Sequence, residues 1–438
     1  MIHGSHCPTF ALEVAQLSDL GMRRSNNQDS LAVVVTADAH KWSSRGHLMM
    51  VADGMGAHAA GELASKMAVD NVPHIYFKLR DLYPPAALRQ AIRETNALIH
   101  TKGQSSIGFN GMGTTCSCLV LLPQGALVAH IGDSRVYRLR GLRLAQLTFD
   151  HSLVWEMAAA GRMEEKDVPS YIPKNVITRS LGPHENVNID LEGPFDAANG
   201  DVFLLCSDGL SGQVTDAEIG ALLHCLSPAE AVQTLVDLAN LRGGPDNISV
   251  VVAKVVGDRC GAPKPPSEEM KDTVVGAIPP KRENWILPTI SVAILLILAF
   301  CLVNEWWLAS ALAGVALLAS IGMLAVRRTN GGGFCPSPAS LGGPYGNGPY
   351  RDTSAEPDEK IVESLAGLVE KLRGIPDGQG PPIDWTPLDE LVAVAKAAAE
   401  SRDFCAAVRS YAETLRTVMH QFRQHRLTLA DDSGVYRA

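Results

Sequence analysis

The stretch HLMMVADGMGAHAAGE, residues 47–62, combines the two patterns from which the fold class of this chain can be predicted. Its first half is an unbroken apolar run, typical of a buried β-strand, and the run ends at Asp53-Gly54. A helical pattern follows from Ala59 to Phe77. A carboxylate at a strand end, followed by glycine, lies where the backbone turns and can point into a cleft. The stretch therefore predicts a strand, a candidate functional turn and a helix in succession.

Three more aspartates lie next to apolar runs and are flanked by small or turn-forming residues. They are Asp29, Asp208 and Asp246, in NNQD (26–29), LLCSDGLSG (204–212) and GGPDNISV (243–250). One Asp at a strand end is more often a simple turn, but four in one chain favour a cluster of carboxylates. Such a cluster would repel itself unless divalent cations neutralised it, and hard oxygen ligands suit Mg²⁺ or Mn²⁺ rather than zinc. Because two such cations can activate a shared water for attack on phosphorus, the predicted reaction is phosphomonoester hydrolysis.

The order of the motifs resembles that of the metal-dependent protein phosphatases of type 2C, specifically their bacterial branch. Eight motifs carry the resemblance: GMRRSNNQDS (21–30), VADGMGAHAAGE (51–62), GMGTT (111–115), HIGDSRVYRLR (130–140), TFDHS (148–152), NVITRSLG (175–182), CSDGLSG (206–212) and GGPDNISVVV (243–252). Together they span about 250 residues. The resemblance implies an α/β fold, an α-β-β-α sandwich of two antiparallel sheets flanked by helices, with the metals in a cleft at one end of the strands.

The resemblance also implies a role for each site residue. Asp53 would bridge two Mn²⁺ or Mg²⁺ ions, the Gly54 carbonyl and Asp29 would complete one side, and Asp208 and Asp246 would hold the other. Water between the ions would be the nucleophile. Arg24 matches the phosphate-binding arginine of the family, since a planar guanidinium suits a phosphate. Asp133 matches a ligand for a third, weaker ion; a structural turn in which Arg135 pairs with a local carboxylate is the alternative.

Four positions depart from the family pattern or stay open. Gln28 stands where many members carry Glu, which predicts a modest change in metal affinity. Met55 follows Asp-Gly where the eukaryotic branch has His, so the proton donor to the leaving group is undefined, with His58 a candidate for that role or for a structural one. His151 in FDHS is equally ambiguous. Residues 153–174 correspond to the variable flap and are expected to touch the substrate protein.

Composition limits the partners. The chain has 438 residues, 46% of them apolar, and a formal charge of -9 without any long run of Lys or Arg. We therefore expect a substantial core and no nucleic-acid partner, because binding to a phosphate backbone needs clustered positive charge. Nine cysteines without a CxxC pair fit a reducing compartment rather than a disulfide framework, and the N-terminus shows no secretory signal.

Two apolar stretches after the catalytic segment predict a membrane anchor. Residues 1–257 form the phosphatase domain and 258–284, rich in Pro, Lys and Glu, a linker. Within 285–327, segments 286–303 and 306–326 are each long enough to cross a bilayer, and basic residues flank the pair. This pattern predicts a transmembrane helical hairpin and a multi-pass protein of the cell membrane, with both soluble parts in the cytoplasm.

The C-terminal part predicts helices behind a second linker. Residues 328–357 are rich in Gly and Pro, and 358–428 show helical periodicity compatible with a small bundle, either plain or like a single tetratricopeptide hairpin. These helices could bind a protein partner. The expected substrates are phosphorylated Ser/Thr proteins, such as a Ser/Thr kinase or its substrates. The alternative is a catalytically silent, phosphatase-like scaffold that recruits partners at the membrane, but it is disfavoured because all four aspartates and Arg24 are present.

Overall fold

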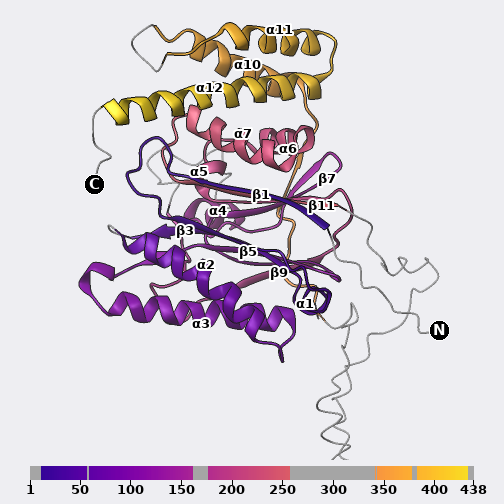
Figure 1. The fold of residues 1–438 in the computed structure, drawn as a ribbon. Helices are drawn as coiled ribbons and strands as arrows, with labels where there is room; N and C mark the ends of the chain where they lie inside the picture. Colours follow the sequence, from indigo (N-terminus) through magenta and orange to yellow (C-terminus); the bar gives the residue numbers. More distant parts are fainter. Residues whose placement is uncertain are drawn as a thin grey trace, which may run out of the picture. The chain divides into compact units, whose positions relative to one another are not determined.

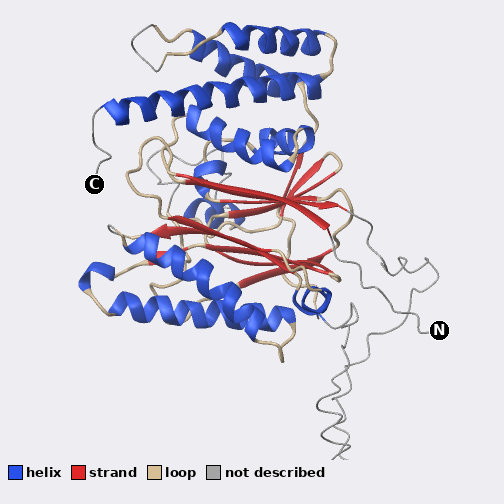
Figure 2. Ribbon diagram, in the orientation of Figure 1, coloured by secondary structure: helices blue, strands red, loops and turns tan. Residues whose placement is uncertain are grey.

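Two antiparallel β-sheets form the centre of the protein (Figure 2). The computed structural model describes residues 11–56, 59–160, 176–256, 341, 343–376 and 382–432. The first sheet has the strand order β1-β11-β10-β7-β8-β12, and the second has the order β2-β3-β5-β6-β9, with β4 paired to β3. The predicted pair of antiparallel sheets is confirmed.

The strand bounds are as follows. In the first sheet they are β1 Ala11–Asp19, β7 Arg135–Arg140, β8 Arg143–Gln146, β10 Val202–Cys206, β11 Ile248–Val256 and β12 Arg351–Ser354. In the second sheet they are β2 Asp29–Val34, β3 His47–Met55, β4 Gly113–Thr114, β5 Cys116–Leu122, β6 Gly125–Ile131 and β9 Asp190–Phe195.

Helices cover the outer face of each sheet (Figure 1). The second sheet is covered by α2 (Ala60–Lys78) and α3 (Pro84–Gln104), and the first by α6 (Asp216–Cys225) and α7 (Pro228–Leu241). The short helices are α1 (Ala39–Arg45), α4 (Leu153–Ala159) and α5 (Asp208–Ser211), with a 3-10 turn at Ile107–Phe109. The C-terminal helices are α10 (Glu359–Arg373), α11 (Thr386–Glu400) and α12 (Phe404–Asp432).

Strand β3 shows why the apolar run builds the centre of this sandwich. Side chains alternate between the two faces of a strand, and here both faces are buried. Leu48 and Met50 join the core between the second sheet and α2 and α3, whereas Met49 and Val51 join the core between the two sheets. All four are fully buried. The continuous apolar run of β3 therefore packs against the other sheet on one face and against α2 and α3 on the other. This packing determines the position of Asp53 near the end of the strand.

The C-terminal helices pack on the phosphatase domain. Helix α12 contacts α6 and α7, and one hydrophobic core runs from Leu204 of β10 through Leu235 of α7 to Leu415 of α12. The expectation of a separate bundle behind a flexible linker differs from this finding. Within the predicted linker, Arg351–Ser354 form β12 on the edge of β8, and Tyr345 bridges to Gly193 of β9. This segment therefore touches the edges of both sheets.

The predicted location in the cell membrane is contradicted. No helix in the described part of the chain is long and apolar enough to cross a bilayer. The two segments on which the prediction rested, 286–303 and 306–326, lie outside the described residues.

Candidate active site

The four predicted aspartates lie at one end of the two sheets. Asp29 begins β2 and is the direct cross-strand partner of Asp53 near the end of β3. Asp208 follows β10 and opens α5, and Asp246 stands two residues before β11, the strand that pairs with β10. Antiparallel pairing thus brings the end of one strand beside the start of its neighbour in both sheets.

These ends border a cleft of about 320 Å³. Its lining includes the predicted site residues Arg24, Asp53, Gly54, Asp133, Asp208 and Asp246. The rest of the lining is Gln28, Met55, Gly56, Thr115, Ile177 and Asn247. Asp29 does not line the cleft. It is buried beneath it, where the Ser207 hydroxyl donates a 2.7 Å hydrogen bond to its Oδ2. His58 lies outside the described residues, as do residues 161–175 of the predicted flap.

Close packing explains the glycine after Asp53. The Gly54 amide donates a 3.1 Å hydrogen bond to the Gln28 carbonyl. A Cβ on Gly54 would lie 2.1 Å from the Gly61 carbonyl oxygen and 2.5 Å from that of Gln28. Only glycine fits there, because both obstacles are backbone atoms. The turn is therefore held against the first turn of α2 and the NNQD loop.

Burial and mutual repulsion dominate the electrostatics of the cluster. Burial raises the pKa of Asp29 to about 7 and that of Asp133 to about 8, and neighbouring aspartates add to both shifts. The same two causes raise the pKa of Asp53 well above its usual value, and that of Asp208 is raised as well. Ionised carboxylates are therefore costly here without compensating positive charge.

The donor set of this cluster fits divalent cations. Asp29 Oδ1 and Asp208 Oδ1 are buried and have no hydrogen-bond partner among the described residues, which leaves two carboxylate oxygens available as ligands. Among the described residues, no three His, Cys, Asp or Glu side chains are arranged to hold one ion by themselves. That arrangement suits Mg²⁺ or Mn²⁺ with few protein ligands, because such ions keep several waters.

Arg24 lies on the rim of the same cleft. Its Nη2 donates a 2.7 Å hydrogen bond to Asp246 Oδ2, and the two side chains are 47% and 33% exposed. The guanidinium is thus both solvent-accessible and directed at the carboxylate cluster. A planar cation in that position can receive an oxyanion that enters the cleft.

Asp133 is held in place by a buried histidine. The Gly132 amide donates a 3.0 Å hydrogen bond to His151 Nδ1, and the His151 amide donates one of 2.7 Å to the Gly132 carbonyl. Because Nδ1 accepts, Nε2 carries the proton and donates to Asp190 at 2.9 Å. The His151 side chain is fully buried, so it positions the turn before Asp133 and does not face the cleft.

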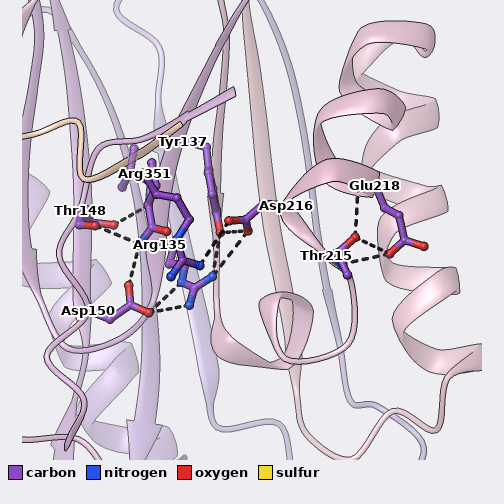
Figure 3. A network of polar contacts seen from close by, with 10 residues as sticks. Arg135, Tyr137, Thr148, Asp150, Thr215, Asp216, Glu218 and Arg351 are labelled. Carbon is purple, nitrogen blue, oxygen red and sulfur yellow. Dashed lines mark hydrogen bonds and ion pairs between the residues drawn. The ribbon is translucent and has the colours of Figure 1, made fainter. Parts of the chain in front are cut away.

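Arg135 belongs to a separate polar network, shown in Figure 3. It pairs with Asp150 at 2.7 Å and Asp216 at 3.6 Å, and it donates to the Tyr137 hydroxyl at 3.0 Å. Arg351 of β12 lies 3.6 Å from Asp216. The local pairing of Arg135 that formed part of the alternative for this turn is therefore present.

Sequence reasoning missed the residues that fix the ligand loops. Thr115 Oγ1 accepts a 2.8 Å hydrogen bond from the Asp53 amide. Asn247 Oδ1 accepts from the Gln28 amide at 2.8 Å, while its Nδ2 donates to the Leu20 carbonyl at 2.9 Å. Their signal was their place in the motifs GMGTT and PDN, directly beside predicted ligands.

Comparison with known proteins identifies the family of this chain. The protein phosphatase 2C family matches residues 22–239. A putative protein phosphatase 2C-type of Streptococcus pyogenes is 37% identical over 248 residues, which cover 55% of this chain and 96% of the relative. The chain belongs to the protein phosphatase 2C family. It is accordingly a metal-dependent phosphoprotein phosphatase of the bacterial branch, and its cofactor is Mn²⁺ or Mg²⁺.

Two solved structures of this family complete the comparison. The Streptococcus agalactiae serine/threonine phosphatase is 34% identical, with a TM-score of 0.50 over 56% of this chain and all of that one. The catalytic domain of the serine/threonine phosphatase PstP, solved in complex with two manganese ions, is 35% identical, with a TM-score of 0.46 over 57% of this chain and all of that one. Helices α10, α11 and α12 lie outside the residues that the phosphatase 2C family matches.

Proposed function

We propose that this phosphatase hydrolyses phosphoserine and phosphothreonine in proteins, with two Mn²⁺ or Mg²⁺ ions held by Asp29, Asp53, the Gly54 carbonyl, Asp208 and Asp246. The observation that carries the proposal is the pair of buried oxygens Asp29 Oδ1 and Asp208 Oδ1, which have no hydrogen-bond partner in the described part of the chain. They belong to a cluster in which burial and neighbouring carboxylates raise the pKa of Asp29 and Asp208. Bound cations would be coordinated by the two oxygens and would also stabilise the ionised form of the carboxylates.

When bound, the two ions supply a water activated for attack on phosphorus. The residues of the chain bind the phosphate and orient the metal ligands. Arg24 at the rim holds the phosphate by paired N–H donors, and its charge offsets that of the phosphoryl oxygens. Thr115 fixes the backbone of Asp53, and Asn247 fixes that of Gln28, so that the ligands are preorganised. Asp133, which lines the same cleft, would hold a third and weaker ion.

Phosphorylated Ser/Thr proteins are the proposed substrates, and we include a Ser/Thr kinase and its substrates among them. Support comes from the relatives, several of which are named serine/threonine phosphatases, including that of Listeria monocytogenes, 34% identical over 243 residues. The Arg24 side chain is 47% exposed, so a phosphorylated side chain on a protein surface could reach it.

Hydrolysis of matched phosphopeptides by the full chain tests the proposal. Peptides that carry phosphoserine, phosphothreonine or phosphotyrosine in one sequence are incubated with Mn²⁺, and phosphate release is measured before and after EDTA. We expect release from the first two that stops with EDTA. Release from phosphotyrosine alone would overturn the substrate class, and no release from any peptide would favour the silent scaffold.

A further inference from the structure

A pair of thiols lies where the C-terminal helices meet the phosphatase domain. Cys225 is the last residue of α6, and Cys405 stands in the first turn of α12. The Arg409 Nε, one helical turn beyond Cys405, donates a 2.7 Å hydrogen bond to the Cys225 carbonyl. Residues four apart share one face of a helix, so Cys405 and Arg409 face the end of α6 together.

The two side chains pack in the same core. Cys225 belongs to the core that runs from α6 to α12, Cys405 packs against that core, and Cys405 is close enough to Cys225 to raise the pKa of its thiol. Cys225 is only 5% exposed, whereas Cys405 is half-buried. An oxidant in solution therefore reaches Cys405 first, with Cys225 already beside it.

The surroundings give the two thiols different chemistry. Burial, followed by the contact with Cys405, raises the pKa of Cys225 above its usual value, so this thiol is a poor first nucleophile. Cys405 lies in the first turn of a long helix and is the more exposed of the two thiols, so it is the one that a small disulfide can reach. The pair thus has an attacking and a resolving member.

We propose that Cys225 and Cys405 form a reversible disulfide that fastens α12 to α6. The Cys405 thiolate attacks one sulfur of a small disulfide such as oxidised glutathione, which breaks the S–S bond and releases one small thiol. The Cys225 thiolate, its proton lost to solvent, then displaces the second small thiol. The protein loses two electrons and two protons in total, and the small disulfide is reduced to two thiols.

The disulfide would join α6 and α12, two helices that lie far apart in the sequence. Cross-linking closes the long loop between α6 and α12, which lowers the entropy of the unfolded chain and stabilises the native state. It also holds the C-terminal helices on the side of the domain where α6 begins with Asp216, the shared partner of Arg135 and Arg351. Reduction by a dithiol would restore the two free thiols.

Peptide mapping of the full chain tests this inference. The chain is incubated in glutathione buffers of increasing oxidised fraction and analysed by mass spectrometry, and melting is followed in parallel. We expect a Cys225–Cys405 cross-linked peptide in the oxidised sample, a melting temperature several degrees above that of the reduced sample, and reversal by a dithiol.

Single variants supply the controls. Cys405→Ser, at the half-buried position, should fold, form no such peptide and melt at one temperature in both buffers; Cys225→Ser should behave in the same way if it folds. If the oxidised wild type retains both thiols, carries glutathione on Cys405 alone, or melts at the temperature of the reduced form, the inference is wrong.

Discussion

Arg24 and Asp246 are joined across the rim of the cleft by a 2.7 Å hydrogen bond between Nη2 and Oδ2. The residue proposed to bind phosphate thus contacts a residue proposed to bind metal. Because the pair is partly exposed, its contribution to folding stability is small. The role of the pair is to hold the positively charged Arg24 guanidinium beside the site before the substrate binds.

Replacing Arg24 should therefore impair substrate binding far more than stability. A charge-assisted hydrogen bond contributes about 1.5–3 kcal/mol, so Arg24→Ala should raise KM for a phosphopeptide by about 10- to 100-fold with little change in the melting temperature. Steady-state kinetics would measure this. The exposed neighbour Arg23→Ala is the control, and an unchanged KM in Arg24→Ala would remove the assigned role.

Gly54 is predicted to tolerate no side chain. In Gly54→Ala the new methyl carbon would lie 2.1 Å from the Gly61 carbonyl oxygen, so the turn after Asp53 must shift. A misplacement of that kind should lower kcat by about 100-fold. Gly141→Ala is the control for glycine replacement, because a Cβ there meets no atom within 4 Å, although its φ of +59° makes a small loss of stability expected. Equal activity of the two variants would contradict the packing argument.

Tyr350 anchors the C-terminal segment to the second sheet. Its hydroxyl donates a 2.5 Å hydrogen bond to the buried Glu192, which also accepts from the Gly348 amide. Tyr350→Phe leaves that carboxylate with one donor fewer and should lower the free energy of unfolding by about 1–3 kcal/mol. Urea denaturation would show this. The control is Tyr83→Phe, because Tyr83 directly precedes α3 and is 56% exposed. This variant should change the free energy of unfolding by less than about 0.5 kcal/mol.

The contact between α6 and α10 should weaken in acid. Burial disfavours ionised Glu218, but hydrogen bonds from Arg242 and Ser364 outweigh that effect and lower its pKa from 4.5 to about 2. A depressed folded-state pKa means that the stabilisation is complete above the unfolded value and is lost as the pH falls from about 4.5 towards 2. Denaturation curves of wild type and Glu218→Gln should therefore converge over this range. A constant difference between them down to pH 2 would refute the assignment.

The sequence predicted the site better than it predicted the surroundings of the site. Asp29, Asp53, Asp208 and Asp246 were identifiable because each combines an apolar strand with a turn residue, a pattern that depends on local backbone alone. Their convergence required the register of both sheets, in which Asp29 stands opposite Asp53. No local pattern contains that register, so the resemblance to the phosphatase family supplied it.

The C-terminal segment was predicted less well for a physical reason. Residues 351–354 have no apolar alternation, and they form a strand only because β8 offers an unpaired edge. The guanidinium of Arg351 lies 4.8 Å from the ring of Trp155 in α4, a tertiary contact that composition does not reveal. In the same way, the amphipathic helices 358–428 indicated a buried face without indicating that α6 and α7 would cover it.

The most direct test is metal binding and turnover in Asp53→Asn. Titration calorimetry of the wild type with Mn²⁺ should show two tight sites, and the same protein should release phosphate from a phosphothreonine peptide. Asp53→Asn should fold, bind less Mn²⁺ and lose at least about 1,000-fold in kcat, because one carboxylate is proposed to serve both ions. An Asp53→Asn variant with wild-type metal binding and turnover would contradict the account.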